Sequence, residues 1–504
     1  MKVSATSEAD ARIARGRHLA RSHRYKEAFD ELWRAVALRP EDSAAHRELG
    51  RALQLAQLWL DAIGPLRRAI ELGDDDLELH FQLVLSLLDT DRTEEALALL
   101  NRLASVRPAS PQVHAHRATA LLDSGNPTAA LSALRQAASL DRARFGGFEQ
   151  VDVAELVSGP VGDIARHSAA HGQEPKSPGP GAYAAYPVPD ARILGDYFLV
   201  MARDGTLFSD GLTFNPESMQ DRALAYDHVS LFIGRRRYMA KTGPERRIAG
   251  AHLLIGGHQN FGHWLMNCVA RLAYVEMIPE LASLPVVVPY GLSETRSELL
   301  TLAGYGPDRR TEIDPSGVTR LELLWTPITL YRVQRQPRRL MLHTACGRYL
   351  NRLARRVCPR RPTPARRIYL QRPPGGHRRL LNERQLLDAL AGFGVEALDP
   401  MTLSMRDQIE LARQAELIIG VMGAGLNLAF FADRGTKVIQ LAPSDVPLNS
   451  LPMICRQLEQ SLSEIVCDRV AARDNLLYDD LVAPVEQVAA VVANALSPAR
   501  DAQS

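Results

Sequence analysis

The chain has 504 residues, of which 46% are hydrophobic and 23% charged, and its formal net charge is +2. This length predicts two to four domains, each able to bury its own core. The balanced charge excludes a fibrous or highly charged disordered protein and gives no overall preference for nucleic acid. The sequence contains no apolar run of about 18 residues that would predict a membrane span. Residues 1–24 also lack the apolar core of a secretory signal, so we expect a cytoplasmic protein.

The cysteines do not have the paired spacing of a zinc site or a disulfide framework. Their odd number favours reduced thiols that pack as small hydrophobic side chains. We therefore expect no metal site among them. They are Cys268, Cys346, Cys358, Cys455 and Cys467.

Small residues recur with a period of 34 in the first part of the chain, a spacing typical of helical hairpin repeats. The positions that set the period are Ala28, Ala62, Ala96 and Ala130. Further small residues accompany them at fixed offsets, where they would let paired helices approach closely. The pattern resembles four tetratricopeptide repeats over residues 9–144. The resemblance implies a superhelix whose concave face holds a peptide or protein partner. A rigid spacer or a dimerisation unit is the alternative.

Residues 145–189 are interpreted as a linker. Their second half, 171–189, is rich in proline, glycine and alanine and has no hydrophobic period.

From residue 190 onward, short apolar runs alternate with amphipathic stretches, a pattern that predicts α/β domains with parallel strands. The predicted strands cover 251–257, 284–289, 320–327, 366–372, 395–400, 416–421 and 436–443. The predicted helices cover 263–278, 293–304, 337–357, 382–394, 404–415 and 484–496, with a short helix after residue 425. A proline-rich break at 358–365 favours two sheet-based domains, 190–345 and 346–498, that face a cleft.

Three predicted strand ends carry polar or glycine-rich motifs. The first is GGHQNFGHW (256–264), the second is YLQRPPGGHRRLLNE (369–383), and the third lies within ELIIGVMGAGLNLAFF (416–431). Open parallel sheets bind ligands beyond the carboxyl ends of their strands. The three motifs are therefore the candidate functional sites.

The second and third motifs together predict a site for a diphosphate. Gly423, Ala424 and Gly425 let backbone N–H groups crowd an anion at the start of a helix. Arg372 and Arg379 follow a neighbouring strand and supply charge-assisted hydrogen bonds. The glycines alone would fit an ordinary tight turn equally well.

The segment from Arg332 to Arg384 holds sixteen arginines and one acidic residue, Glu383. A solvated basic face and a surface for an anionic donor or glycan acceptor both fit this composition. A nucleic-acid groove is disfavoured, because aromatic residues are not interleaved and no RNA-binding motif is present.

The ordered set NFGHW, YLQR, RRLLNE, LSMRDQI, GAGL and FADRGTKVIQLAP resembles glycosyltransferase family 61 over residues 190–470. The resemblance implies a GT-B fold, in which two Rossmann-like domains face a cleft and the second holds a nucleotide sugar. It also implies inverting transfer without an obligatory metal or other cofactor, with a UDP-sugar as the expected donor.

The resemblance assigns roles to individual residues. Arg372 and Arg379 would face the donor phosphates, Asn382 and Glu383 would hold the strand–helix junction, and 423–425 would supply backbone donors. The supporting residues would be Asn260, Trp264, Arg271 and Asn427. Three positions depart from the family pattern, namely Met422, Leu428 and Asn267, which stand where the family often has histidine, asparagine and an acidic residue.

His263 is the candidate catalytic base, on the cleft wall opposite the donor. Inverting transfer needs a group that takes the acceptor hydroxyl proton, and imidazole titrates near neutral pH. The alternative is a histidine that only props the turn above Trp264.

Two functions follow from these patterns. The first is an active glycosyltransferase whose repeats recruit a protein partner or a protein or polysaccharide acceptor. The second is a scaffold protein with a catalytically silent transferase half. Because a repeat array contacts mainly itself, residues 1–144 are expected to be removable without unfolding the rest.

Overall fold

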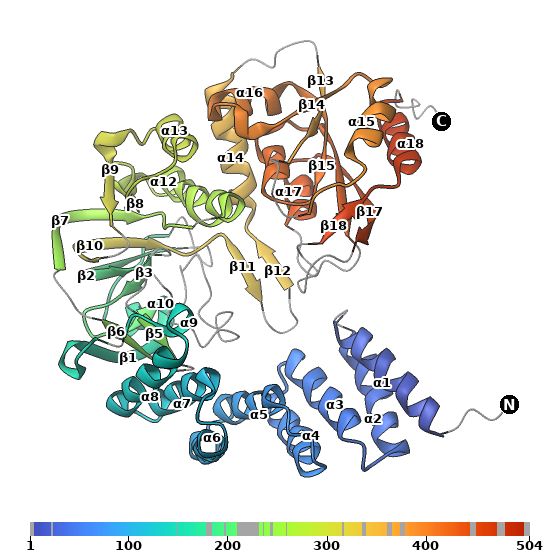
Figure 1. Cartoon of the computed structure of the whole chain (residues 1–504). Helices are drawn as coiled ribbons and strands as arrows, with labels where there is room; N and C mark the ends of the chain where they lie inside the picture. Colours follow the sequence, from blue (N-terminus) through green and yellow to red (C-terminus); the bar gives the residue numbers. More distant parts are fainter. Residues whose placement is uncertain are drawn as a thin grey trace.

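The protein consists of a helical array, a large mixed sheet and a smaller, mostly parallel sheet, as the computed structural model shows (Figure 1). The structure describes residues 5–21, 24–148, 150–177, 184–195, 198–208, 231–234, 236–241, 245–258, 260–314, 317–334, 339–359, 365–372, 378–443, 450–470 and 479–497.

Four helical hairpins form the N-terminal array. Their helices are α1 (Ala5–Arg21), α2 (Tyr25–Leu38), α3 (Ser43–Leu55), α4 (Trp59–Glu71), α5 (Leu77–Asp89), α6 (Thr93–Val106), α7 (Pro111–Asp123) and α8 (Pro127–Leu140). The second helices of the hairpins begin at Tyr25, Trp59, Thr93 and Pro127, each 34 residues after the last. The predicted repeat period is therefore confirmed in the helices themselves.

Close approach of paired helices explains the small residues of the repeat. A Cβ atom on Gly16 would lie 2.5 Å from Cγ of Leu32, and one on Gly50 would lie 2.5 Å from Cδ2 of Leu66. These two pairs are related by one period. The four alanines that set the period are completely buried. Larger side chains at these positions would push each hairpin apart.

The first sheet has ten strands in the order β5-β6-β1-β4-β3-β2-β10-β7-β8-β9. The strands are β1 (Leu156–Gly162), β2 (Ala185–Leu194), β3 (Leu199–Met201), β4 (Leu207–Phe208), β5 (Leu231–Ile233), β6 (Arg237–Lys241), β7 (Glu245–Leu254), β8 (Val286–Pro289), β9 (Arg310–Ile313) and β10 (Val318–Pro327). Strands β10, β7, β8 and β9 are parallel neighbours, and β2 joins β10 in antiparallel register.

Short helical elements accompany this sheet. They are α9 (Arg142–Phe145), η1 (Val153–Glu155), α10 (Ile164–Ala170), α11 (Phe261–His263), η3 (Trp264–Cys268), η4 (Val269–Leu272), α12 (Ala273–Met277), η5 (Pro279–Leu281), α13 (Glu294–Leu302) and η6 (Pro307–Arg309).

The second sheet has six strands in the order β14-β13-β15-β16-β17-β18. They are β13 (Arg366–Leu370), β14 (Val395–Leu398), β15 (Ala415–Val421), β16 (Lys437–Pro443), β17 (Ser461–Val470) and β18 (Asp480–Val482). All neighbours are parallel except β17 and β18. The helical elements are α14 (Thr344–Val357), α15 (Glu383–Ala391), η7 (Pro400–Thr402), α16 (Met405–Gln414), η8 (Ala424–Phe431), α17 (Leu451–Gln457) and α18 (Val485–Leu496). The parallel α/β pattern predicted for this part is confirmed.

The two sheet regions share one hydrophobic core. This core contains Trp264 and Val286 from the first region and Met405 and Phe430 from the second. Glu298 on α13 also accepts the backbone N–H of Met405 at 2.6 Å, so the first region caps a helix of the second. The core holds the carboxyl ends of the two sheets near each other.

The helix predicted over 337–357 begins later than expected. Residues 339–342 form strand β12 (Arg339–Leu342), which pairs with β11 (Tyr331–Gln334). Helix α14 starts after His343, whose Nδ1 accepts the N–H of Ala345 at 3.2 Å. Arginine, leucine and methionine favour helices locally, but pairing with β11 outweighs that propensity.

The segment 145–189, predicted as a linker, contains ordered structure. Strand β1 pairs with β6 in antiparallel register, and α10 follows it. The local pattern did not reveal this strand, because its partner lies about 80 residues further along the chain. The predicted boundary at residue 190, between a linker and the first α/β domain, stays a prediction.

The last hairpin of the array packs directly on the first sheet. A single hydrophobic cluster contains Leu122 of α7, Leu134 of α8, Phe148 and Met239 of β6. Asp123 at the end of α7 accepts the N–H groups of Arg236 and Arg237 at 3.0 and 3.2 Å. The array thus contacts more than itself, contrary to expectation.

Among the helices that the structure describes, none has both the length and the apolar composition needed to cross a membrane.

Candidate functional site

The first motif forms a short, capped helical turn beyond the carboxyl end of β7. The side chain of Asn260 accepts the N–H of His263 at 3.2 Å and so caps α11. The N–H of Asn260 in turn donates to Nδ1 of His258 at 3.0 Å. The rings of His258 and His263 stack with their centroids 4.8 Å apart. The polar residues of the motif therefore fix the position of both imidazoles.

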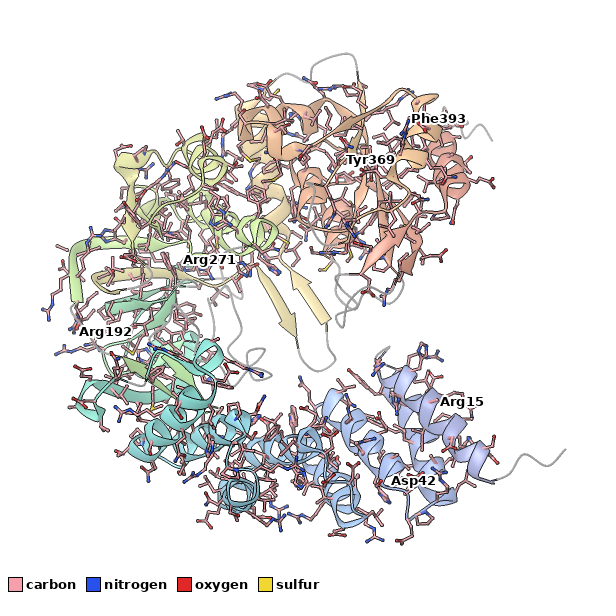
Figure 2. All side chains as sticks on the ribbon, viewed as in Figure 1. Arg15, Asp42, Arg192, Arg271, Tyr369 and Phe393 are labelled. Atoms are coloured by element: carbon pink, nitrogen blue, oxygen red, sulfur yellow. The ribbon has the colours of Figure 1, made fainter. Side chains whose placement is uncertain are left out.

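A π-helical turn, η3, follows α11 in place of the regular helix predicted over 263–278. Such turns are rare and frequently occur at functional sites. Trp264 and Arg271 are completely buried within this region, and Nη1 of Arg271 donates to the carbonyl of Ile255 at 3.3 Å. Figure 2 labels Arg271 among the turns beside the first sheet. Both residues hold the turn rather than line an open surface.

The second motif places Arg372 against the glycine turn of the third. Nη2 of Arg372 donates to the carbonyl of Met422 at 2.6 Å. A Cβ atom on Gly423 would lie 1.9 Å from the same Nη2 and 3.7 Å from Nη2 of Arg378. The φ of Gly423 is +155°, a conformation that favours glycine. Glycine is required here because the guanidinium groups occupy the space of a side chain.

Arg372 and Arg378 bring two positive charges to this turn. Burial, followed by the charge of Arg378, lowers the pKa of Arg372 to about 10. An anion beside both guanidinium groups would relieve this repulsion. Arg378 belongs to the second motif, but the sequence predicted no donor contact for it. Its backbone φ of +58° is unusual for a residue other than glycine.

Arg379 lies elsewhere, although the sequence placed it with Arg372. Its guanidinium pairs with Asp480 on β18 at 2.5 Å, and its N–H donates to the same carboxylate at 3.0 Å. Asp480 is buried, whereas the Arg379 side chain is 55% exposed. The structure therefore joins Arg379 to β18 and not to the glycine turn.

Asn382 and Glu383 hold the start of α15. The Asn382 amide exchanges two hydrogen bonds with the backbone of Ala483, at 2.8 and 2.9 Å. Glu383 accepts the hydroxyl of Tyr369 on β13 at 2.9 Å. Figure 2 labels Tyr369 within the second sheet. These contacts fix the junction between β13 and α15.

The first and third motifs touch each other across the two sheet regions. A Cβ atom on Gly262 would lie 2.4 Å from Nδ2 of Asn427 and 3.6 Å from Cα of Ala424. Asn427 is itself buried. The turn that carries His263 therefore lies directly against η8, which begins after Gly423. All three motifs meet in one place.

Arg296 is a site residue that the sequence did not reveal. It lies in the first turn of α13, after the carboxyl end of β8, and its guanidinium carbon lies 5.5 Å from the centre of the Trp264 ring. Burial lowers the pKa of Arg296. Ligands bind beyond the carboxyl ends of parallel strands, and the same argument applied to β8 would have pointed to the segment that contains Arg296.

Both imidazoles of this turn have lowered pKa values, which favours their neutral forms. Burial lowers the pKa of His263. Burial, together with the charges of His263 and Arg296, lowers the pKa of His258 to about 3. A neutral imidazole can accept a proton, as a general base must. His258 is too weak a base to hold a proton near pH 7.

Several arginines of the basic segment 332–384 are engaged in ion pairs. Such pairs favour the solvated basic face over a dedicated anion surface for this part of the segment. The pairs are Arg352 and Arg356 with Glu276, Arg355 with Asp433, Arg366 with Glu396, and Arg367 with Glu416.

Residues 261–439 match the family model described as Glycosyltransferase 61. The match begins at α11 and ends in β16, so it includes the glycine turn, Arg372, Arg296 and His263. No curated protein sequence matches the chain.

The helical array is similar to solved tetratricopeptide-repeat structures. YrrB, described as a TPR protein with an unusual peptide-binding site, is 18% identical over 26% of this chain and 68% of its own, with a TM-score of 0.24. MamA from Desulfovibrio magneticus RS-1 is 17% identical over 27% and 76%, with a TM-score of 0.25. MamA MSR-1 is 20% identical over 28% and 81%, with a TM-score of 0.26. Because these scores are low, the repeat architecture depends on the spacing of the chain's own helices.

Proposed function

We propose that the protein transfers a sugar from a nucleotide-sugar donor, a UDP-sugar, to a hydroxyl group of a protein or glycan, because residues 261–439 match the family model described as Glycosyltransferase 61. The transfer inverts the anomeric centre and requires no metal. The two sheet regions act as the two halves of a GT-B fold. The observation that carries this proposal is the meeting of Arg372, Gly423 and Gly262 in one place.

The donor diphosphate binds at the glycine turn. The first N–H groups of η8 have no acceptor within the helix, as at any helix start, and they face the position where an anion is favoured. Arg372 and Arg378 add charge-assisted hydrogen bonds from the other side of the turn. Arg296 supplies a third cation from the first sheet region.

His263 takes the acceptor proton. The acceptor oxygen attacks the anomeric carbon while the bond from that carbon to the diphosphate oxygen breaks. The hydroxyl proton passes to the imidazole of His263, and the nucleoside diphosphate leaves with its negative charge beside Arg372 and Arg378. The half-buried imidazole, whose pKa is lowered by burial, supports this role.

The scaffold alternative was motivated by the three positions that depart from the family pattern. Met422, Leu428 and Asn267 are all buried, with exposed fractions of 8%, 4% and 3%. Met422 contributes its backbone carbonyl to Arg372, a contact that does not depend on its side chain. The departures are therefore compatible with an active site.

The array recruits the acceptor or a protein partner in this proposal. It continues directly into the first sheet through α7 and α8, so a partner bound to the array is held at a fixed position relative to the catalytic domain. Nucleic acid is not a proposed partner.

Mass spectrometry of reactions with a panel of nucleotide sugars tests the proposed activity. We expect one donor to be consumed with release of UDP. The sugar should appear either as a mass increase on an acceptor or, after hydrolysis, as the free sugar. Isothermal titration with UDP alone separates the two functions. A chain that binds no nucleotide and consumes no donor would be the scaffold.

A further inference from the structure

We propose that His167, His171 and Asp204 bind one divalent transition-metal ion, of which Zn²⁺ is the prime example. The two histidines belong to α10 and to the residue after it, and the carboxylate lies in the turn between β3 and β4. This cluster lies outside residues 261–439 and takes no part in the proposed transfer.

The distances between the possible ligand atoms fit a tetrahedral ion. Nε2 of His167 lies 3.2 Å, and Nε2 of His171 3.6 Å, from Oδ2 of Asp204. Metal bonds of about 2.0–2.1 Å at tetrahedral angles would separate two ligand atoms by about 3.3 Å. All three ligand atoms lie within 4.8 Å of one another, close enough for one ion to contact them after small side-chain rotations.

Hydrogen bonds around the cluster orient its side chains as metal ligands are oriented. Nδ1 of His171 lies 2.8 Å from the carbonyl of His167, an acceptor only, so Nδ1 carries the proton and Nε2 keeps a lone pair. Oδ1 of Asp204 accepts the N–H of Thr206 at 2.9 Å, and Oδ2 lies within hydrogen-bond distance of Nε2 of His167, a contact that an ion between the two atoms would replace. Such outer contacts fix tautomer and direction at known metal sites.

The spacing of the two histidines reinforces this arrangement. Residues four apart in a helix lie on the same face, which brings both imidazoles to one side of α10. The two rings stack with centroids 4.1 Å apart, so the exposed His171 ring must turn for both Nε2 lone pairs to face one ion. The His167 side chain is only 9% exposed and meets the edge of Phe208, with centroids 5.0 Å apart. One ligand is thus held rigidly by the sheet.

Solvent reaches the cluster from the other side. The side chains of His171 and Asp204 are 47% and 44% exposed, so an ion can enter and a water molecule can complete its coordination. Two imidazoles and one carboxylate suit Zn²⁺, Ni²⁺ or Co²⁺ and disfavour Mg²⁺ and Ca²⁺, which take oxygen ligands. The ion would tie α10 to the β3–β4 turn.

Isothermal titration of the full chain, without an affinity tag, tests the site. We expect one Zn²⁺ to bind per chain and to raise the melting temperature, whereas Mg²⁺ does neither. His171→Ala and Asp204→Asn should each weaken Zn²⁺ binding at least about tenfold, as loss of a ligand contact does.

Matched controls separate this site from surface binding. His18→Ala on α1 and Glu94→Gln on α6 remove an exposed imidazole and an exposed carboxylate of the helical array, and both should bind Zn²⁺ as the parent chain does. Absence of saturable binding in the parent chain would overturn the proposal. Unchanged binding in the His171→Ala/Asp204→Asn double variant would do so as well, and would leave the cluster as an ion pair only.

Discussion

Arg372 and Arg379 both follow β13, but their different partners predict different consequences of substitution. Arg372→Ala removes a charge-assisted hydrogen bond worth about 1.5–3 kcal/mol from the proposed diphosphate site, so affinity for UDP should fall at least about tenfold. Arg379→Ala is the matched variant. It should leave UDP affinity nearly unchanged and lower the melting temperature, because the buried Asp480 carboxylate loses the guanidinium that pairs with it.

Isothermal titration and thermal unfolding of both variants measure this difference. If both variants lost the same UDP affinity, Arg379 would be part of the donor site after all. Unchanged affinity in Arg372→Ala would remove the diphosphate from the glycine turn.

His263→Gln distinguishes a base from a histidine that only props the turn. Glutamine keeps a hydrogen-bonding group but cannot accept a proton near pH 7. Turnover should fall by about 10²–10⁴-fold while UDP affinity and melting temperature stay close to those of the parent chain. A folded variant with nearly normal turnover would show that another group takes the proton.

The pH dependence of turnover follows from the burial of His263. A base works in its unprotonated form, so activity falls as pH drops through its pKa. Because burial lowers this pKa, the acidic limb of kcat should lie below the ordinary histidine value of about 6.5. The limb should vanish from the residual activity of His263→Gln. A pH profile that is the same in both chains would assign the limb to another residue.

The contact between α11 and η8 makes the geometry of the site depend on a glycine. In Gly262→Ala the added Cβ would overlap Nδ2 of the buried Asn427, so either this side chain or the two elements must shift. We expect a loss of roughly 1–3 kcal/mol in unfolding free energy, typical of overpacking, and a larger fall in transfer than in UDP affinity.

Gly392→Ala is the control for this substitution, since its Cβ would meet no heavy atom within 4 Å and its φ is −63°. Denaturant unfolding and kinetics of both variants give the comparison. If Gly262→Ala transferred sugar normally, the position of α11 against η8 would not matter for catalysis.

The joint between the array and the first sheet determines where the chain can be shortened. Removal of residues 1–144 takes α7 and α8 away and exposes Met239 and Phe148, so this variant should lose stability. Removal of residues 1–109 keeps both helices and their cluster with Met239. It exposes Val113 and Ala120 of α7, which pack in the core of the array, and breaks the surface ion pair between Asp91 and Arg236. The shorter deletion should fold and bind UDP normally.

Transfer to the natural acceptor should fall more than donor hydrolysis in the 1–109 deletion, because the recruiting hairpins are gone. Thermal unfolding, UDP titration and product analysis check the three quantities together. A 1–144 deletion as stable as the 1–109 deletion would mean that the shared cluster contributes little.

Features that depend on residues close together in the chain, or on a regular repeat, could be predicted from the sequence. The 34-residue repeat appears in the helices because each hairpin needs the same small residues where its own helices meet, as at Gly16 and Gly50. The parallel strands of the second sheet were also predicted correctly, because buried strands such as β15 are continuous apolar runs. By contrast, β1 was missed because its partner β6 lies far along the chain, and β12 was missed because its residues favour a helix locally.

The sequence by itself determined which residue types stand at the strand ends, because the strands and the glycine, arginine and histidine residues that follow them are read from contiguous segments. Only the tertiary structure decided which of them meet. It joined Gly262 to Asn427 across two sheet regions and brought Arg372 to Gly423, while β18 engaged Arg379 through Asp480. The physical reason is that contacts between distant segments depend on how whole sheets pack, and a motif carries no information about its neighbours in space.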